Sequence, residues 1–441
     1  MSDAAQSDTR GARPRETDCL TCVKTHPFPD AITEETRITA DALTHDTSPV
    51  AARRLTVMVV VPTLGAGAAE RGAVDLAHVL IGAGHRVVVV SHGGRMEEDL
   101  ADDGATFVRR NVHSKNPFTV LRNAGALTQL ARKHRCDVIH AHGRAPAWSA
   151  YLAARVLRIP FVTSWYKGFR EQNPLKRFYN RIMVRGQRVV AAGDQIAELI
   201  NDRYGTAWDR IVTVPASVDV SDFDPDAVSA ERLEAMRRAW GATAQTQVIL
   251  VLGRMVRRKG HHLVVQSARR MKDMGIRNFL CILCTGEEGM SRYACEIWDL
   301  VVASDAADVC RIVNFPADKQ AAFAAATIAV SAATQAEGTA RAVLEAQAMA
   351  LPLVVSDLAT GPEVVLAPPA VPDDRMTGLR FSSGDERELS AAIVRLLSMS
   401  QAQRQAVGRR GRAWVSAQFT PSVVSDRLLR LYEEFSNARG G

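Results

Sequence analysis

Residues 55–72 read Leu-Thr-Val-Met-Val-Val-Val-Pro-Thr-Leu-Gly-Ala-Gly-Ala-Ala-Glu-Arg-Gly, and this stretch decides the fold. Its first seven residues form a largely apolar run, which is typical of a parallel strand that is buried on both faces. A turn containing Gly65 and Gly67 separates this strand from a helix-like segment that ends near Gly82. A second apolar run over 86–91 follows, so the stretch predicts a strand–helix–strand unit.

The same alternation continues through both halves of the chain. In the first half, further strands are expected over 137–140, 160–165, 189–192 and 211–214. In the second half, strands are expected over 247–252, 279–284, 327–331 and 352–356, with helices over 261–274 and 341–350. The predicted fold class is therefore α/β, with two Rossmann-like, doubly wound parallel-sheet domains that face each other across a cleft. Ligands are expected at the carboxyl ends of the strands.

Changes in composition suggest the domain borders. Residues 1–53 are rich in Thr, Asp, Ala and Pro and are expected to form a disordered tail. Cys19, Cys22 and His26 in this tail lack the fourth ligand that a structural zinc site needs. We expect an N-terminal domain over 54–226, a C-terminal domain over 227–421, and a last helix within 422–441 that returns to the N-terminal domain.

The composition of the 441 residues excludes several classes of protein. With 47% apolar and 23% charged residues, the chain is expected to be globular rather than disordered. Seven cysteines do not make a disulfide framework, so a cytoplasmic location is expected. No apolar run reaches the ~18 residues of a membrane span, and the polar N-terminus does not resemble a secretory signal.

The net charge of +7 is concentrated in one region. Residues 155–188 contain nine Lys and Arg residues and a single acidic residue, Glu171. Such a region attracts an anionic partner, although a solubilising surface is an alternative interpretation. Because no nucleic-acid-binding motif accompanies it, nucleic acid is not an expected partner. An anionic membrane surface is an expected partner. It would place the protein peripherally at the inner face of the cytoplasmic membrane.

Two common nucleotide-binding motifs are absent. The Gly65–Gly67 turn differs from a dinucleotide-binding fingerprint because Glu70 stands at the position of the third glycine. The chain also has no G-x-x-x-x-G-K-[ST] segment. A nicotinamide-dependent enzyme and a P-loop enzyme are therefore not expected.

Two segments of the second half carry residues suited to chemistry. The loop over 253–260 contains Arg254 and Lys259 between a strand and a helix, where cations can bind diphosphate oxygens; a solvated basic loop is the alternative. Glu337 precedes a helix, and Glu345 lies two turns inside its otherwise apolar sequence, where a carboxylate needs a polar partner. Because Arg341 is four residues from each glutamate, an ion-pair ladder on the helix is the alternative.

Four motifs occur in order: Gly67-Ala-Ala-Glu70-Arg71, Asp137-Val-Ile-His140-Ala-His142, Gly253-Arg254 with Lys259-Gly260, and Glu337 with Glu345. Through them, residues 55–435 resemble a retaining glycosyltransferase of family 4 with the GT-B fold, of the lipopolysaccharide or polysaccharide type. The resemblance implies a metal-independent hexosyltransferase without a cofactor. It would move a sugar from a UDP- or GDP-sugar to a lipid-linked saccharide or polysaccharide acceptor.

The resemblance also implies roles for individual residues. Arg254 and Lys259 would neutralise the leaving nucleoside diphosphate, since preorganised cations stabilise the charge that develops there. Glu337 would bind the donor sugar, and Tyr166 stands where the family usually has a histidine that contacts the donor. The other expected substrate-binding residues are Glu345, which would bind the ribose, and Gly67, Glu70, His142, Gly338 and Thr339. No metal site is expected, since no Asp-x-Asp motif stands where it would help.

Departures from the family pattern keep other functions open. Tyr166 replaces the usual histidine, Ala68 the second glycine of the first motif, and Ala340 a glycine after Glu337. A catalytically silent homologue that acts as a binding or scaffold subunit is therefore the alternative, although Arg254, Lys259, Glu337 and Glu345 are all retained. A third option is another GT-B activity, such as sugar-nucleotide epimerisation or phosphorolysis.

Overall fold

A computed structural model describes residues 53–437 apart from 66, 170–172, 286–290 and 315. The predicted tail over 1–53 lies outside the described residues except for Arg53. Cys19, Cys22 and His26 lie outside them too.

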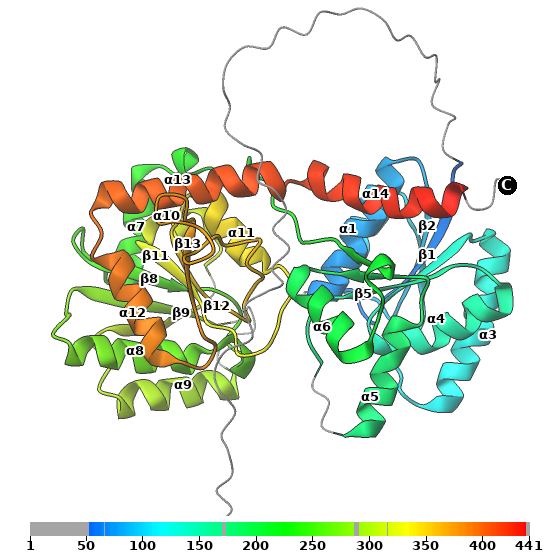
Figure 1. Cartoon of the computed structure of the whole chain (residues 1–441), viewed down its shortest axis with the longest axis horizontal. Helices are drawn as coiled ribbons and strands as arrows, with labels where there is room; N and C mark the ends of the chain where they lie inside the picture. The colour runs from blue at the N-terminus through cyan, green and yellow to red at the C-terminus, as the bar shows by residue number, and fades with distance from the viewer. Residues whose placement is uncertain (1–52, 66, 170–172, 286–290, 315, 438–441) are drawn as a thin grey trace, which may run out of the picture. The chain divides into compact units, whose positions relative to one another are not determined.

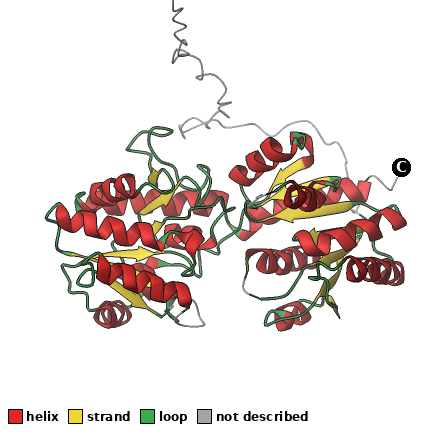
Figure 2. Ribbon diagram, turned by 90° about the horizontal axis from the view of Figure 1, so that it is seen from below, coloured by secondary structure: helices red, strands yellow, loops and turns green. Residues whose placement is uncertain are grey.

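The first half of the chain forms a seven-stranded parallel sheet with helices on both faces (Figures 1 and 2). The strand order β3-β2-β1-β4-β5-β6-β7 shows that the chain starts in the middle and winds outward in both directions. The strands are β1 (Thr56–Val60), β2 (Arg86–Ser91), β3 (Thr106–Arg109), β4 (Val138–His142), β5 (Phe161–Trp165), β6 (Arg188–Ala191) and β7 (Ile211–Thr213). The helices are α1 (Ala68–Gly82), α2 (Glu97–Asp102), α3 (Pro117–His134), α4 (Arg144–Leu157), α5 (Pro174–Asn180) and α6 (Asp194–Tyr204), with 3₁₀ turns η1 (Arg181–Val184) and η2 (Trp208–Arg210).

The second half repeats this plan with a six-stranded parallel sheet of order β10-β9-β8-β11-β12-β13. Its strands are β8 (Gln247–Val251), β9 (Phe279–Cys284), β10 (Cys310–Val313), β11 (Ile328–Ser331), β12 (Leu353–Ser356) and β13 (Gly378–Phe381). Its helices are α8 (His261–Asp273), α9 (Arg292–Ala303), α10 (Lys319–Ala325), α11 (Arg341–Ala348), α12 (Glu386–Leu397) and α13 (Gln401–Gln418), with 3₁₀ turn η4 (Arg257–Lys259). The 3₁₀ turn η3 (Pro225–Ala227) and helix α7 (Ala230–Trp240) connect the two sheets along the chain. The prediction of two doubly wound parallel sheets is confirmed.

Burial on both faces explains the apolar runs that predict the strands. In β1, Val57 and Val59 belong to one hydrophobic cluster, whereas Met58 and Val60 belong to the cluster on the opposite face. Because successive side chains of a strand point to opposite faces, a strand between two helical layers is buried at every position and therefore largely apolar.

Three strands that the sequence does not predict are β3, β10 and β13. Each has four residues, and each lies at an edge of its sheet. An edge strand is covered less than a central one, so β3 lacks a continuous apolar run and has no buried residue.

The last helix, α14 (Pro421–Asn437), packs against α1 of the first half (Figure 1). Leu431 and Tyr432 join the hydrophobic cluster that contains β1 and α1. The hydroxyl of Tyr432 lies 2.6 Å from Nδ1 of His140, whose Nε2 lies 2.8 Å from Oγ of Ser164. Burial holds the pKa of His140 well below its usual value, so His140 is a neutral core residue that connects β4 and β5 to α14.

In the described part of the chain, no helix combines the length and the hydropathy that crossing a bilayer requires.

Replacing Tyr432 with Phe tests the connection between α14 and the first sheet. The variant leaves a buried imidazole nitrogen without its partner, so we expect the free energy of unfolding to fall by about 1–3 kcal/mol. Urea denaturation measures this change. Tyr151→Phe is the control, because the Tyr151 hydroxyl bonds only to the exposed Arg155 and its loss should have little effect. Equal effects of the two substitutions would contradict the role assigned to Tyr432.

Candidate active site

The loop that follows β8 delivers two cations to the carboxylate of Glu337. Nζ of Lys259 lies 2.5 Å from Oε2 of Glu337, and the guanidinium of Arg258 contacts Oε1. All three side chains are largely buried: the side chain of Lys259 is 14% exposed and that of Glu337 is 10% exposed. A buried carboxylate is stabilised only when it is paired, and here two cations share it.

Glu337, Lys259 and Arg258 form a cluster that we call the Glu337 group. More positive charge surrounds this group than the carboxylate of Glu337 can neutralise. Burial, together with the charges of Arg258 and Arg254, lowers the pKa of Lys259 to about 7. Burial and then the charge of Arg258 also lower the pKa of Lys167, which belongs to the first half. Four cations from both halves therefore lie near one carboxylate. Such a cluster attracts a further anion, and guanidinium and ammonium groups are suited to phosphate oxygens.

The segment that carries Glu337 is hydrogen-bonded to the first half. Residues 167 and 337 form an isolated antiparallel bridge. Beside this bridge, the amide of Gly168 donates to the carbonyl of Ala336 (2.9 Å), and the amide of Gly338 donates to the carbonyl of Tyr166 (3.1 Å). The two sheets thus meet at loops that follow their strands, where nucleotide ligands bind in folds of this kind.

Gly338 and Thr339, both predicted to bind substrate, make close contacts with Ala192 after β6. The amide and the hydroxyl of Thr339 donate to the carbonyl of Ala192 at 2.6 and 3.0 Å. A Cβ at position 338 would lie only 2.6 Å from Cβ of Ala192, so this approach requires glycine. In this arrangement the two residues connect the halves, and their predicted contact with substrate stays a prediction.

Tyr166, which is half-buried, and the buried His142 form a pair beside α1. The Tyr166 hydroxyl lies 2.9 Å from Nδ1 of His142, and the two rings are stacked. Burial raises the pKa of Tyr166 and lowers the pKa of His142 to about 3, so both groups are neutral near pH 7. The tyrosine ring fits because residue 72 of α1 is glycine: a Cβ there would lie 2.2 Å from the hydroxyl.

The N-terminus of α1 is covered by one of its own side chains. Gly67 is the N-cap residue, and a Cβ at this position would lie 2.1 Å from Oε2 of Glu70. The Thr63 hydroxyl donates to Oε1 of the same carboxylate (3.2 Å). Glu70 therefore stands where the helix dipole favours an anion. A phosphate could bind at this end of α1 only if Glu70 moved.

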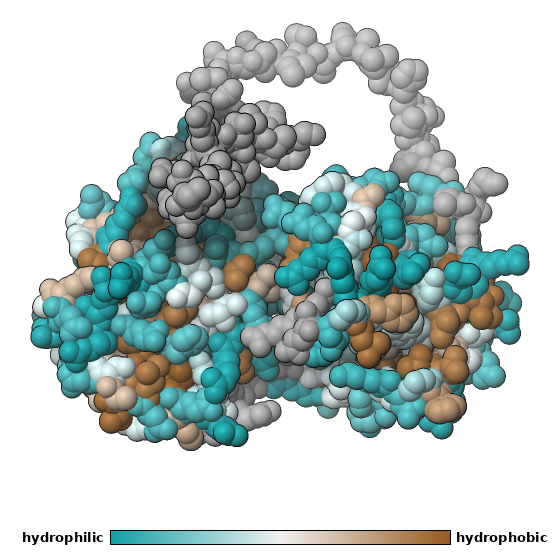
Figure 3. All heavy atoms as spheres, turned by 60° about the horizontal axis from the view of Figure 1, so that its bottom comes forward, coloured by the Kyte–Doolittle hydropathy of each residue, from teal (hydrophilic) through white to brown (hydrophobic). Residues whose placement is uncertain are grey.

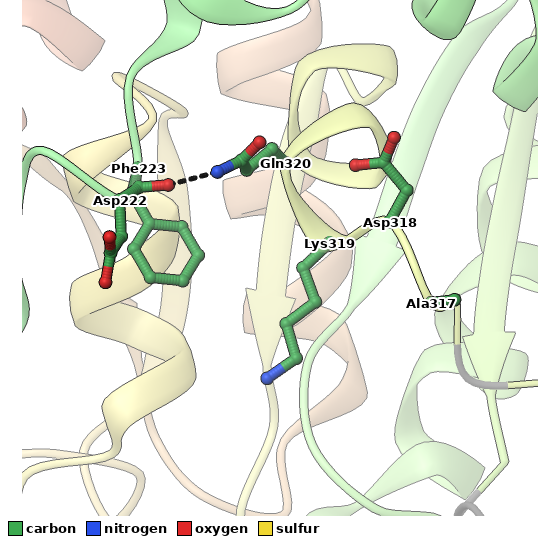
Figure 4. Close-up of a pocket in the computed structure, with 6 residues that line it drawn as sticks. All are labelled: Asp222, Phe223, Ala317, Asp318, Lys319 and Gln320. Atoms are coloured by element: carbon green, nitrogen blue, oxygen red, sulfur yellow. Dashed lines mark hydrogen bonds between the residues drawn. The ribbon is translucent and has the colours of Figure 1, made fainter.

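Glu345 lies apart from the Glu337 group, on the buried face of α11. Burial raises the pKa of its carboxyl, against the opposing charges of Lys319 and Arg341. The suggested ladder on α11 is wrong, because Arg341 pairs with Asp75 of α1 at 2.7 Å. Lys319 lines a pocket of about 460 Å³ (Figure 4), with Asp222, Phe223, Ala317, Asp318 and Gln320.

The structure brings together most of the predicted site residues. The contacts described above join six of them: Lys259, Glu337, Gly338, Thr339, Tyr166 and His142. The charge of Glu70 acts on both Tyr166 and Lys167. Arg254, predicted to be catalytic, is exposed and acts on the group through its charge. Arg258 and Lys167 also belong to this group, although no motif in the sequence singles them out. Their positions could have indicated them, since each directly adjoins a predicted catalytic residue.

Two family models match the chain, one in each half. The model described as Glycosyltransferase Family 4 matches residues 69–222, and the model described as Glycosyl transferases group 1 matches residues 246–399. Together they cover more than half of the chain. The chain belongs to the family 4, group 1 glycosyltransferases.

Individual glycosyltransferases are similar to it at lower identity. A glycosyltransferase of known structure from Rickettsia africae is 25% identical, with a TM-score of 0.76 over 87% of this chain and 98% of its own. The Anabaena protein Alr3699/HepE, solved in complex with UDP and glucose, is 16% identical, with a TM-score of 0.71 over 86% of this chain and 100% of its own, and shows the fold alone. A GDP-mannose-dependent monoacylated alpha-(1-6)-phosphatidylinositol monomannoside mannosyltransferase of Corynebacterium glutamicum is 30% identical over 50% of this chain and 55% of its own length.

Replacing Gly72 with Ala tests the packing of Tyr166 in this glycosyltransferase. Alanine favours a helix by about 1 kcal/mol over glycine. At position 72, however, its methyl group would displace the tyrosine, so we expect a net loss of about 1–3 kcal/mol in the free energy of unfolding.

Urea denaturation of matched variants checks this expectation. Gly82→Ala, at the end of the same helix and with open space around its Cβ, should be neutral or stabilising. In a Tyr166→His background, which has a shorter ring, Gly72→Ala should cost much less. An equal cost of Gly72→Ala with Tyr or His at position 166 would show that the two residues are not coupled.

Proposed function

We propose that this glycosyltransferase transfers a hexose from a nucleoside-diphosphate sugar, with Lys259, Arg258 and Arg254 binding the diphosphate. The observation that carries the proposal is the excess of positive charge around the buried carboxylate of Glu337. Burial and neighbouring cations lower the pKa of Lys259 to about 7, and a bound diphosphate would relieve this repulsion. An anion with at least two negative charges would balance the excess positive charge around Glu337.

The same cations support the chemistry of transfer. The bond between the anomeric carbon and the diphosphate oxygen breaks, and its electron pair stays on the diphosphate. The acceptor oxygen bonds to the anomeric carbon, and its proton passes to the departing diphosphate oxygen. Charge therefore develops on the leaving group, where preorganised cations lower the barrier without the need for a metal ion. Glu337, which pairs with Lys259, is proposed to accept hydrogen bonds from the sugar.

The donor is a UDP- or a GDP-sugar, and Glu345 is proposed to bind its ribose. The Anabaena complex with UDP supports the first donor, and the GDP-mannose-dependent relative supports the second. That relative's name also describes a glycosylated lipid acceptor, which supports a lipid-linked saccharide or a polysaccharide here. Retention of configuration follows from the family resemblance, and NMR of the anomeric proton in the product tests it.

A catalytically silent binding subunit is the second candidate function. Two observations favour it: in this arrangement Glu337 is already paired with two cations, and Glu70 covers the N-terminus of α1. Donor binding with no hydrolysis or transfer in the presence of any acceptor would support this candidate.

Two adjacent arginines offer a matched test of the diphosphate site. Arg258→Gln and Lys259→Ala should each weaken binding of the preferred nucleotide sugar by tenfold or more, because each removes a charge-assisted hydrogen bond worth about 1.5–3 kcal/mol. Arg257→Gln is the control, since Arg257 is exposed and pairs with Glu296. Isothermal titration calorimetry measures affinity, and Glu337→Ala should abolish transfer in the same preparations. Wild-type affinity in Arg258→Gln and Lys259→Ala would refute the site.

The lowered pKa of Lys259 predicts a pH dependence of donor binding. Only the protonated ammonium attracts the diphosphate. Affinity should therefore be highest below pH 7 and should fall as pH rises through the pKa of about 7. A nucleotide sugar is the suitable ligand, because its diester phosphates do not titrate in this range. In Lys259→Arg, whose guanidinium stays charged, the profile between about pH 6 and about pH 9 should be flat. A flat wild-type profile would contradict the assignment.

A further inference from the structure

Helix α5 and the turn η1 form an exposed segment that carries both apolar and basic side chains. Leu175 is 75% exposed and Phe178 is 61% exposed, although both are large hydrophobic residues. Lys176, Arg177 and Arg181 are exposed as well, so the cations alternate with the apolar side chains along α5 and into η1. In the right-hand half of Figure 3, apolar patches lie among hydrophilic side chains on the face shown.

This segment is held rigidly enough to present these side chains. Ile182 and Met183 of η1 are buried in the core, and the ring of Phe178 lies beside that of Trp148 of α4, with ring centres 6.0 Å apart. The side chain of Asn173 accepts a hydrogen bond from the amide of Lys176 and caps α5. The exposed apolar side chains are therefore a fixed feature of the surface.

The charge of the segment is one-sided. Residues 173–193 contain five Lys and Arg residues and no Asp or Glu. Arg177 and Arg181 also line a surface pocket of about 350 Å³ together with Pro174 and Phe178. Two guanidinium groups beside an aromatic and a proline ring suit a phosphate whose neighbouring groups are apolar, which is the chemistry of an anionic lipid.

We infer that α5 and η1 dock the enzyme onto an anionic bilayer surface. Leu175 and Phe178 enter the boundary between headgroups and acyl chains, while Arg177 and Arg181 bind lipid phosphates. A protein partner would normally offer acidic side chains, but it would not need several protruding apolar side chains set among cations; a bilayer supplies both kinds of contact at once. The inference goes beyond the proposed function and needs neither donor nor acceptor for its test.

The test is flotation of the full chain with vesicles of phosphatidylcholine, with and without phosphatidylglycerol. The wild type should float with the anionic vesicles at low salt and lose most of this binding at about 0.5 M NaCl, where charges are screened. Arg177→Gln with Arg181→Gln should lower the partition coefficient by about 25-fold, at about fivefold per cation. Leu175→Ala with Phe178→Ala should lower it by more than tenfold and leave its salt dependence unchanged.

Matched variants of the second half separate this surface from a general effect of charge or hydrophobicity. Met274→Ala with Val302→Ala removes exposed apolar side chains, and Arg292→Gln with Arg409→Gln removes exposed cations. Both pairs should bind vesicles like the wild type, and circular dichroism should show every variant folded. Loss of binding in these control pairs equal to that in the α5 variants would overturn the inference. So would retention of the wild type by RNA in preference to anionic vesicles.

The outcome is separable from that of the proposed function. Arg177→Gln with Arg181→Gln should bind the nucleotide sugar with wild-type affinity, because neither residue lies in the Glu337 group. Flotation that persists when no nucleotide sugar binds would reject the proposed donor site and leave the membrane surface intact.

Discussion

The arrangement of the candidate site depends on the pairing of one buried carboxylate, Glu337, with Lys259 and Arg258. Each partner alone would be costly: an isolated buried charge destabilises a protein by several kcal/mol. The pairing therefore fixes the loop after β8 against the segment before α11. That segment is in turn hydrogen-bonded to the loops after β5 and β6, so one ion-pair group sets the position of residues from both sheets.

The charged side chains and the neutral hydrogen-bonding side chains of the candidate site come mainly from different halves of the chain. The cations come mainly from the second half, where a diphosphate is proposed to bind. Tyr166 and His142 of the first half are both neutral and hydrogen-bonded to each other, so they offer polarity without charge. Tyr166, which stands where the family resemblance leads us to expect a histidine, is thus uncharged near pH 7 and fills the space beside Gly72.

Much of the fold could be predicted from sequence because two-sided burial demands an unbroken apolar run, as in β1, β2, β8 and β9. The edge strands β3 and β10 escaped prediction because their burial is incomplete, whereas β13 is largely buried but has only four residues, one of them Arg380. Spacing along the chain placed Lys259 and Glu337 in separate motifs, but no periodicity shows that they touch. The sequence also could not distinguish Arg258, which pairs with Glu337, from its neighbour Arg257, which pairs with Glu296.

The return of α14 to the first sheet has a consequence for the order of synthesis. Leu431 and Tyr432 complete a hydrophobic cluster that also contains residues of β1, β2 and α1, which lie more than 300 residues earlier in the chain. While the ribosome is still making the second half, the first half lacks the apolar side chains of α14, and His140 lacks its tyrosine partner. Its final packing must wait until α14 has been made, and until then the nascent domain exposes apolar surface.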